Sequence, residues 1–569
     1  MAYFYPVGNT PAVSLTQGLP HEKRADLLLL GCGDIRHILF TAHCDPARQL
    51  DTTCRDSTKA VIARNILLLS LILDDTKSAN PLLWDLYYHF RVDKASLNLL
   101  EAQARKLCTL STSLQAWHQS EYGQRIRLCG QGSLAAVREM WSFYAKSAAH
   151  PDLFDAESNM RIQAAREDRS NPFRGTTPPS NLTVLRSTAP TTLMTGEDLS
   201  LEYTRYWQRG TTYRGKDAAL HGNPMFHPLD SNVHLHYATD PLLGFHLATT
   251  YAPLDATQTT SAVSPSQPST PAEGARAEFQ SWILSLRKAA KPAVLRFFIG
   301  DALAFSHFLQ HKNRLGNTRP AHWHRAWFDF EPLVLDTNDY AENGPAPRVF
   351  DVIDTSNLID YVGAIGVLAA TSPLLKNDAP ATIFTENLIR ESKTHKELMD
   401  NLLFGDLQTV STLLGLVPVE VVTNTSPSCT RDETIILAII SAGKDQREAA
   451  PTSRQLFSRI PWKRPIMLNK GSGRLQLGVI LRFSSTDLAN VLHSVYTKMF
   501  ENQKPTTASK LNAGTRDNRS NFAAFLRLVK TQVKGDWRET METLIGFIQA
   551  RATQGSQMAE NDYTEEVCT

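Results

Sequence analysis

Hydrophobic and polar positions in the first part of the chain follow a pattern that predicts strand, turn and helix, twice in succession. Four consecutive leucines at residues 27–30 have the length of a buried strand and end in a Gly-Cys-Gly-Asp turn at residues 31–34. Apolar residues then recur at helical spacing. A short strand over 50–56 and a helix over 59–73 complete the pattern. Strand, glycine turn and helix in this order are typical of the opening of a nucleotide-type α/β fold.

The same α/β pattern returns in the second half of the chain. Apolar runs of strand length cover residues 294–301, 350–357 and 382–387, and helical segments separate them. Residues 80–169 show mostly helical periodicity. The economical interpretation is one α/β domain with a mostly parallel sheet, interrupted by a large helical insertion.

The expected division of the chain follows from these segments. The two halves of the Rossmann-like domain are 1–80 and 291–420, separated by the mainly helical insertion 81–290 and followed by an α+β extension over 421–569. Within the insertion, segments 171–192 and 252–277 are rich in Pro, Ser and Thr and are predicted to be flexible loops.

Composition excludes several classes of protein. The chain has 569 residues, with 59 Lys and Arg against 57 Asp and Glu, so binding to a nucleic acid would need a local basic patch. The seven cysteines include no CxxC pair, so a zinc finger is not expected and reduced thiols are. No signal peptide and no apolar run of membrane-spanning length is present, which predicts a cytoplasmic protein without a membrane partner.

Polar residues follow five of the expected strands. Ligands of open parallel sheets bind at the carboxyl ends of the strands, and Asp56 stands where an acidic residue meets ribose hydroxyls in such folds. The carboxylates of segment 350–360 suit a cationic group such as a guanidinium, although Asp354 and Ser356 could simply cap the next helix. The expected substrate-binding set is Gly31, Gly33, Arg36, Asp56, Asp240, Asp301, Asp351, Asp354, Asn357 and Glu386.

Several side chains are candidates for catalysis. Cys32 would be an activated nucleophile if a helix dipole stabilised its thiolate, but a small buried residue is the plainer interpretation. The histidine-rich segment 233–246 could supply acid/base groups or be a packed entry to a helix, and a metal site is not expected there. The candidate catalytic residues are Cys32, Asp34, His236, Tyr237 and Ser356.

The segment 520–547 has strong helical periodicity. On a helical wheel one arc of about 100° collects basic side chains, opposite an apolar face. This face is either solvated or a contact surface for a phosphate backbone, and residues 462–464 and Lys470 could extend it. The candidate tRNA-binding residues are Arg519, Arg527, Lys530, Lys534 and Arg538.

Five segments resemble a fungal family of uncharacterised domains. They are YPVGNTPAVSLT (5–16), LLLLGCGDIRHILFT (27–41), KAVIARNILLLSLILDD (59–75), VHLHYATDPLLGFHLATTYA (233–252) and FFIGDALAF (297–305). That family is distantly related to the N-terminal domain of dynein axonemal assembly factor three, and many members are labelled MYND-finger proteins. This chain departs from them in having no MYND cysteine cluster. The resemblance implies a methyltransferase-like Rossmann fold.

One branch of that family comprises arginine-containing cyclodipeptide synthases. For this chain the resemblance implies an aminoacyl-transferase type of enzyme that condenses arginine from arginyl-tRNA with a residue from a second aminoacyl-tRNA into a cyclo-Arg-Xaa diketopiperazine. Because the esters arrive activated, no cofactor is expected. The basic helix would then hold tRNA, and the acidic strand ends would hold the arginine.

Two alternatives to this function stay open. The glycine turn, Asp56 and Asp301 would also suit an S-adenosylmethionine-dependent methyltransferase, although Ile35 stands where the third glycine of that motif belongs. A non-catalytic Rossmann-like scaffold or assembly factor is the other alternative.

Overall fold

The computed structural model describes residues 2–8, 10–21, 23–75, 80–147, 154–156, 158–160, 163, 192–213, 220–229, 233–235, 241–248, 270–289, 291–316, 333–387, 395–425, 458–469, 474–478, 480–501 and 518–552. None of the helices within these ranges has the length and apolar character needed to cross a membrane.

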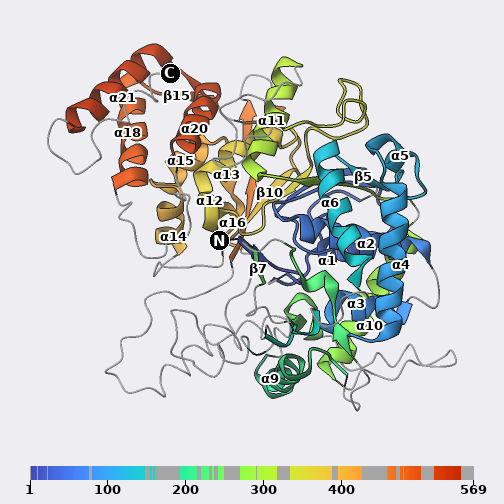
Figure 1. Ribbon diagram of the computed structural model, residues 1–569. Helices are drawn as coiled ribbons and strands as arrows, with labels where there is room; N and C mark the ends of the chain where they lie inside the picture. Colours follow the sequence, from blue (N-terminus) through green and yellow to red (C-terminus); the bar gives the residue numbers. More distant parts are fainter. Residues whose placement is uncertain are drawn as a thin grey trace.

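A central eight-stranded sheet organises the chain (Figure 1), with the strand order β11-β12-β10-β9-β2-β3-β8-β5. The strands are β2 (Ala25–Leu30), β3 (Leu50–Asp56), β5 (Ile126–Leu128), β8 (Val294–Ile299), β9 (Val352–Asp354), β10 (Thr382–Asn387), β11 (Val417–Pro418) and β12 (Ser458–Lys463). Neighbouring strands from β5 to β10 pair in parallel, and β12 runs antiparallel to both β10 and β11. The mixed α/β, Rossmann-like architecture predicted from the sequence is confirmed, and a reversed strand beside the last parallel one is typical of its methyltransferase-like variant.

The leucine run of β2 is buried on both faces of the sheet. Leu27 and Leu29 belong to one hydrophobic core, whereas Leu28 and Leu30 belong to the other. Side chains of a strand alternate between the two faces, so a strand covered on both faces needs a continuous apolar run instead of an alternating one. This explains the pattern that identified the strand in the sequence.

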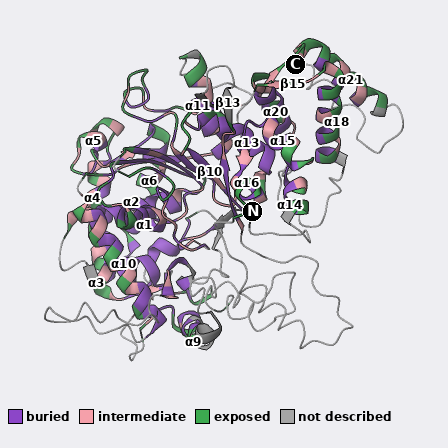
Figure 2. Cartoon of the chain, turned by 180° about the vertical axis from the view of Figure 1, so that it is seen from behind, coloured by how far each residue is buried: buried purple, intermediate pink, exposed green. Residues whose placement is uncertain are grey.

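Helices cover each face of the sheet, and the strands between them are almost entirely buried (Figure 2). One core contains residues of α1 (Arg36–Cys44), α2 (Lys59–Asp74), α3 (Asn80–Tyr88), α4 (Lys94–Leu110), α6 (Gln131–Tyr144), α9 (Thr192–Arg209) and α10 (Pro271–Lys288). The other contains residues of α11 (Ala302–Leu315), α13 (Ala364–Thr371), α14 (His395–Leu402), α15 (Leu407–Leu413), α18 (Ser485–Glu501), α20 (Arg519–Gln532) and α21 (Trp537–Ala552).

Shorter elements complete the described parts. They are β1 (Ala2–Phe4), β4 (Arg91–Val92), α5 (Leu114–Gln119), β6 (His221–Gly222), η3 (Pro224–Phe226), β7 (Val233–Leu235), η4 (Pro241–Gly244), α12 (Ile359–Val362), η8 (Ser372–Leu374), α16 (Val419–Thr423), β13 (Ile466–Asn469), β14 (Arg474–Leu477), β15 (Leu481–Arg482) and β16 (Val533–Lys534). The segment 81–290 is therefore more than a helical insertion, because it supplies β5 to the edge of the central sheet and β7 as the parallel partner of β1.

The loop predicted over 252–277 is wrong from residue 271 onward, where α10 begins. Thr270 caps this helix by accepting the backbone N–H of Glu273 at 3.3 Å, and Pro271 occupies the first turn. A capping threonine, an N-terminal proline and an early glutamate together form a helix-start signal. The rest of that predicted loop, and nearly all of the one over 171–192, lies outside the described residues.

The single amphipathic helix expected over 520–547 is also wrong. The helix α20 ends at Gln532, and β16 then pairs in parallel with β15 before α21 begins at Trp537. Gly535 lies in the break. A helical wheel drawn through this segment therefore does not describe one continuous face.

Candidate functional site

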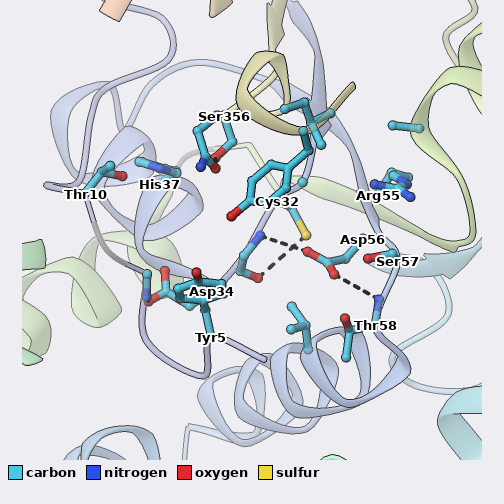
Figure 3. A pocket seen from close by; sticks show the side chains of 18 of the residues that line it. Tyr5, Thr10, Cys32, Asp34, His37, Arg55, Asp56, Ser57, Thr58 and Ser356 are labelled. Atoms are coloured by element: carbon cyan, nitrogen blue, oxygen red, sulfur yellow. Dashed lines mark hydrogen bonds between the residues drawn. The ribbon is translucent and has the colours of Figure 1, made fainter. Parts of the chain in front are cut away.

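A cavity of about 370 Å³ opens at the carboxyl edge of the sheet, where β2 lies between β3 and β9 (Figure 3). The chain leaves β2 and β9 toward opposite faces, so this is the switch point at which such sheets bind ligands. Its volume lies in the usual range for small-molecule sites. The cavity brings together nine residues expected from the sequence: Gly31, Cys32, Gly33, Asp34, Arg36, Asp56, Asp301, Ser356 and Asn357.

Backbone hydrogen bonds hold the glycine turn against the end of β3. Gly31 and Gly33 have φ of +76° and +55°, which side-chain-bearing residues rarely adopt. The N–H groups of Gly31 and Cys32 both donate to the carbonyl oxygen of Arg55, at 2.8 and 2.9 Å. The geometry accounts for both glycines without a ligand.

Asp56 connects this turn to the start of α2. One carboxylate oxygen accepts the Gly33 N–H at 3.3 Å, and the other accepts the Thr58 N–H at 3.0 Å. Burial raises the pKa of Asp56, while Arg55 and these backbone donors oppose the rise. Because both oxygens already accept hydrogen bonds, Asp56 would have to share them with any ribose hydroxyl.

Asp34 and Arg36 form a buried ion pair beside the turn. The Arg36 Nε lies 2.7 Å from Asp34 Oδ2, which also accepts the Tyr87 hydroxyl at 2.7 Å and the Gly8 N–H at 3.0 Å. Burial would raise the pKa of Asp34, but Arg36 and these donors overcome it and hold the pKa at about 2. Asp34 is therefore ionised and fully occupied, which suits a positioning role and not proton transfer.

Glycines pack directly against the Arg36 guanidinium. A Cβ on Gly244 would lie 1.4 Å from Arg36 Nη1, and one on Gly8 would lie 2.4 Å from Nη2. The other hydrogen bond of Arg36 goes to the Thr10 carbonyl oxygen at 2.9 Å. Three chain segments that are distant in sequence therefore meet at one buried cation.

Cys32 lies in the cavity wall as a buried thiol. A hydrogen bond with Cys54, together with burial, raises its pKa well above the ordinary value, and Asp56 adds to the rise. The helix α1 begins only at Arg36, so its dipole does not act directly on the sulfur. The geometry favours the packing interpretation of Cys32 over the nucleophile.

The acidic ends of β9 and β10 already hold a guanidinium, which belongs to the protein. Arg459 of β12 lies 2.5 Å from Asp354 Oδ2 and 2.6 Å from Glu386 Oε1, and all three side chains are buried. Arg459 keeps the pKa of Asp354 low despite burial. Neither carboxylate lines the cavity. The expectation that Asp354 and Glu386 bind a substrate guanidinium is therefore wrong.

Asp351 lies at the opposite edge of the sheet. It precedes β9, accepts the backbone N–H of Asp26 at 2.8 Å and pairs with Lys376 at 2.7 Å. Lys376 also pairs with Asp26, the second residue of β2, so these ion pairs connect the amino ends of two neighbouring strands. The assignment of Asp351 to the ligand site is wrong, because Asp351 precedes β9, whereas the cavity lies at the other end of that strand.

Ser356 and Asn357 follow β9 into the cavity. Ser356 has φ of +48°, a strained conformation for a residue with a side chain, and its N–H donates to Asp354 Oδ1 at 2.9 Å. Its hydroxyl lies 3.5 Å from Asn357 Oδ1. Asp354 thus caps this turn, whereas the plainer interpretation predicted that Asp354 and Ser356 cap the next helix; the N-cap of α12 is Leu358, without a side-chain cap. The Ser356 hydroxyl lies at the cavity wall.

His37 lines the cavity but was not selected from the sequence. Its Nδ1 accepts the Val13 N–H at 3.1 Å, so the proton of the neutral ring lies on Nε2. Burial lowers the pKa of His37 to about 4, against the opposing effect of Asp354. His37 is therefore a neutral hydrogen-bond donor at the cavity wall. Its position in the first turn after a glycine motif is the signal that could have identified it.

Six further polar residues of the wall were also missed, two of which are Ser57 and Thr58 directly before α2. Arg55 directly precedes Asp56 and is buried, and the hydroxyls of Tyr5, Thr10 and Tyr361 come from the N-terminal segment and from α12. Figure 3 shows Arg55 beside Asp56, across the cavity from His37. Tyr5 and Thr10 belong to the quoted segment 5–16, but its place at the sheet edge depends on tertiary contacts that a local pattern does not reveal.

The basic residues of the C-terminal region do not share one helix face. Arg538 belongs to α21, where it pairs with Glu542 at 2.8 Å. Arg527 is half-buried, and burial together with Arg314 lowers its pKa. Lys530 and Lys534 are exposed, and Arg519 begins α20.

The basic residues at 463, 464 and 470, which were expected to extend this basic face, do not form such an extension among the described residues. Lys463 and Arg464 donate to the backbone carbonyls of Pro380 and Ser372, at 2.9 and 3.0 Å, and Lys470 lies outside the described residues. Lys463 therefore connects the end of β12 to the segment before β10, and Arg464 connects it to η8.

Three predicted residues of the histidine-rich segment, His236, Tyr237 and Asp240, lie outside the described residues. His246 of the same segment packs against the N-terminal region, with Nε2 at 2.8 Å from the Ala12 carbonyl oxygen. Within the described ranges, no group of three His, Cys, Asp or Glu side chains could hold a metal ion.

Comparison with known proteins adds one match. A family model described as "Domain of unknown function (DUF4470)" matches residues 6–92, which contain β2, the glycine turn, α1, β3 and α2. No curated protein and no solved structure matches the chain. The matched segment supplies much of the cavity wall, but Asp301 and Ser356 lie outside it.

Proposed function

We propose that the chain is a tRNA-dependent cyclodipeptide synthase that joins arginine to a second amino acid, with the cavity at the carboxyl edge as the place of condensation. The observation that carries this proposal is the neutral His37, which presents an N–H donor at the cavity wall. The family resemblance of the sequence supplies the substrate class, arginyl-tRNA and a second aminoacyl-tRNA.

The reaction needs two acyl transfers. In the first, the α-amine of one aminoacyl group attacks the ester carbonyl of the other, forming a C–N bond and releasing one tRNA, whose 3′-terminal ribose oxygen takes up the proton. The free amine of the resulting dipeptide then attacks the remaining ester, closes the ring and releases the second tRNA in the same way. Each attack places negative charge on a carbonyl oxygen, which a preorganised donor stabilises. His37 Nε2–H is the donor proposed for this role.

The arginine side chain requires a carboxylate, and the structure changes which one is proposed. Arg459 already neutralises Asp354 and Glu386. Asp301 lines the cavity and uses one oxygen to cap α11 through the Ala304 N–H at 2.7 Å. Its other oxygen has no hydrogen-bond partner among the described residues. We therefore assign the substrate guanidinium to Asp301.

An S-adenosylmethionine-dependent methyltransferase is the second candidate. The sheet order with its reversed β12, and the carboxylates that follow β3 and β8, favour it. Against it stand Ile35 at the third glycine position and the two backbone hydrogen bonds that occupy Asp56.

The decisive experiment is expression of the full chain in a bacterial host, followed by mass spectrometry of the medium for arginine-containing diketopiperazines. We expect such a product, and a loss of roughly 100-fold or more in the His37→Ala variant, the usual effect of removing an oxyanion donor. His37→Gln keeps an N–H donor and should retain part of the activity. His43→Ala is the matched control, because His43 is an exposed histidine on the same helix. Absence of any diketopiperazine, with thermal stabilisation by S-adenosylmethionine, would overturn the proposal in favour of the methyltransferase.

A further inference from the structure

Arg55 is a buried cation without a bonded partner. It is the penultimate residue of β3 and is 4% exposed. The Nε is buried and makes no hydrogen bond. Among the described residues, no oxygen accepts a hydrogen bond or forms an ion pair with its guanidinium. An isolated charge in the interior is costly, so an arginine in this state normally has a reason to be there.

The other buried arginines show which contacts Arg55 lacks. Each of them reaches at least two oxygen atoms: Arg36 reaches Asp34 and Thr10, Arg48 reaches Asp45 and Pro20, Arg64 reaches Pro6 and Tyr87, Arg296 reaches Asp51 and Asp339, and Arg459 reaches Asp354 and Glu386. The other buried arginines of the described ranges thus have hydrogen-bond partners for their guanidinium groups. Arg55 has none, and it lines the cavity.

The charges around Arg55 do not supply the missing bond. Asp301, Asp56 and Cys32 face it and favour its charged form, yet burial still lowers its pKa. The oxygens of Asp56 accept the N–H groups of Gly33 and Thr58, and Asp301 accepts that of Ala304. Asp56 is thus committed to the backbone through both oxygens and Asp301 through one, and neither carboxylate is hydrogen-bonded to Arg55, so the guanidinium N–H groups remain for another acceptor.

The start of α11 lies at the same part of the cavity. Ala302 and Leu303 line the cavity together with Arg55. They form the first turn of a 14-residue helix, where backbone N–H groups have no partner within the helix. A helix start and an arginine fork both favour oxyanions, and the arginine fork matches a phosphate or a carboxylate with two hydrogen bonds.

We propose that Arg55 and the first turn of α11 form an oxyanion subsite within the cavity, and that this subsite takes the phosphate of the nucleotide that carries the aminoacyl group. The oxyanion subsite stands on the geometry alone. The choice of a tRNA phosphate rests on the proposed function. A carboxylate, such as that of S-adenosylmethionine, has the same chemistry and is the competing source of the anion.

The test compares adenosine 5′-monophosphate with adenosine by isothermal titration calorimetry on the full chain. The monophosphate reproduces the phosphate of a terminal adenosine, and the pair differs only in that group. We expect the monophosphate to bind roughly 10- to 100-fold more tightly than adenosine, the range for charged hydrogen bonds. In Arg55→Gln this preference should disappear. Equal affinities in the unmodified chain, or a preference that survives in Arg55→Gln, would overturn the proposal.

The melting temperature shows whether a loss of binding comes from unfolding. Because Arg55 makes no internal bond, Arg55→Gln and Arg55→Leu should leave Tm unchanged or raise it when no ligand is present. Arg459→Gln is the matched control, since it removes a buried arginine that has two partners and should lower Tm. A fall in Arg55→Gln as large as in Arg459→Gln would show that Arg55 is a structural residue and would overturn the subsite.

Two further results separate this proposal from the proposed function. Arg55-dependent binding of S-adenosylmethionine without binding of adenosine monophosphate would identify the anion as a carboxylate and refute the phosphate. Cyclodipeptide formation in the bacterial host is measured independently of both ligands. If no product forms and the phosphate preference still depends on Arg55, the proposed function fails and the oxyanion subsite stands.

Discussion

Arg459 on β12 lies 2.5 Å from Asp354 at the end of β9, two strands away in the sheet. The same guanidinium lies 4.3 Å above the ring of Phe384, on the strand between them. A reversed strand thus places its arginine against the carboxyl ends of parallel strands, where it neutralises acidic residues that would otherwise face a ligand. The ion pair closes this side of the sheet to a cationic substrate.

The first prediction concerns the stability that this ion pair provides. Arg459→Gln should lower the free energy of unfolding by about 3–5 kcal/mol, because it leaves two buried carboxylates without their cation. Urea denaturation measures this change. Arg538→Gln removes an exposed arginine that pairs with Glu542 and should have no measurable effect. Equal stability of the Arg459→Gln protein and the unmodified chain would show that the pair does not form in solution.

The second prediction concerns the packing of Gly244 on Arg36. A Cβ at this position would lie 1.4 Å from Arg36 Nη1, which is itself held by Asp34 and Thr10. Gly244→Ala should therefore destabilise the protein by about 3 kcal/mol, the upper part of the range for overpacking. Differential scanning calorimetry would detect it as a lower Tm.

Gly546→Ala provides the control for that glycine substitution. Gly546 lies inside α21 with no atom within 4 Å of an added Cβ. Alanine favours the helix, so this variant should gain about 0.5–1 kcal/mol. A Gly244→Ala protein as stable as Gly546→Ala would contradict the packing described around Arg36.

The third prediction concerns pH. The pKa of Asp34 falls from 3.8 to about 2 in the folded protein, so its ionised form is preferentially stabilised by folding. The resulting contribution, about 2 kcal/mol, is complete above pH 5 and is lost as the pH falls toward 2, with about half gone at pH 3. Asp34→Asn lacks this titration. The gap in unfolding free energy between the two proteins should therefore narrow between pH 5 and pH 3, and a constant gap would contradict the low pKa.

The fourth prediction concerns tRNA. Lys530 and Lys534 remain exposed although they lie on different elements, so they can still contact a phosphate backbone. The double variant Lys530→Glu and Lys534→Glu should bind tRNA more weakly, with a slope of log K against log salt that is smaller by about one to two. Lys94→Glu is the control, because Lys94 is exposed at the start of α4, far from α20 (Figure 1). An unchanged slope in the double variant would remove this surface from the tRNA site.

The sequence predicted the core of the fold because local pattern and tertiary role coincide there. The leucine run 27–30 and the strand beginning at Val294 are buried on both faces, so their apolar character is visible without a structure. The strand β12 escaped prediction because Pro461 and two charged residues interrupt it. Its stability comes from pairing with β10, which a local pattern does not reveal.

The candidate site was predictable only where it lies next to the glycine turn. Asp56 and Asp301 follow recognisable strands, and the structure places both at the cavity. The partner of Asp354, Arg459, is 105 residues away in sequence, so its neutralising effect could not be anticipated. The helix break after Gln532 was missed because the apolar spacing continues across it, although Gly535 marks the point.

The small parallel pair of β1 and β7 determines which segments of the chain are needed to form this cavity. It joins residues 2–4 to residues 233–235, and Tyr5, Gly8 and Thr10 continue from β1 into the cavity wall. The wall is thus assembled from the beginning of the chain, from the glycine turn and from strands beyond residue 290. An excised 6–92 fragment would therefore have the glycine turn but not the complete cavity.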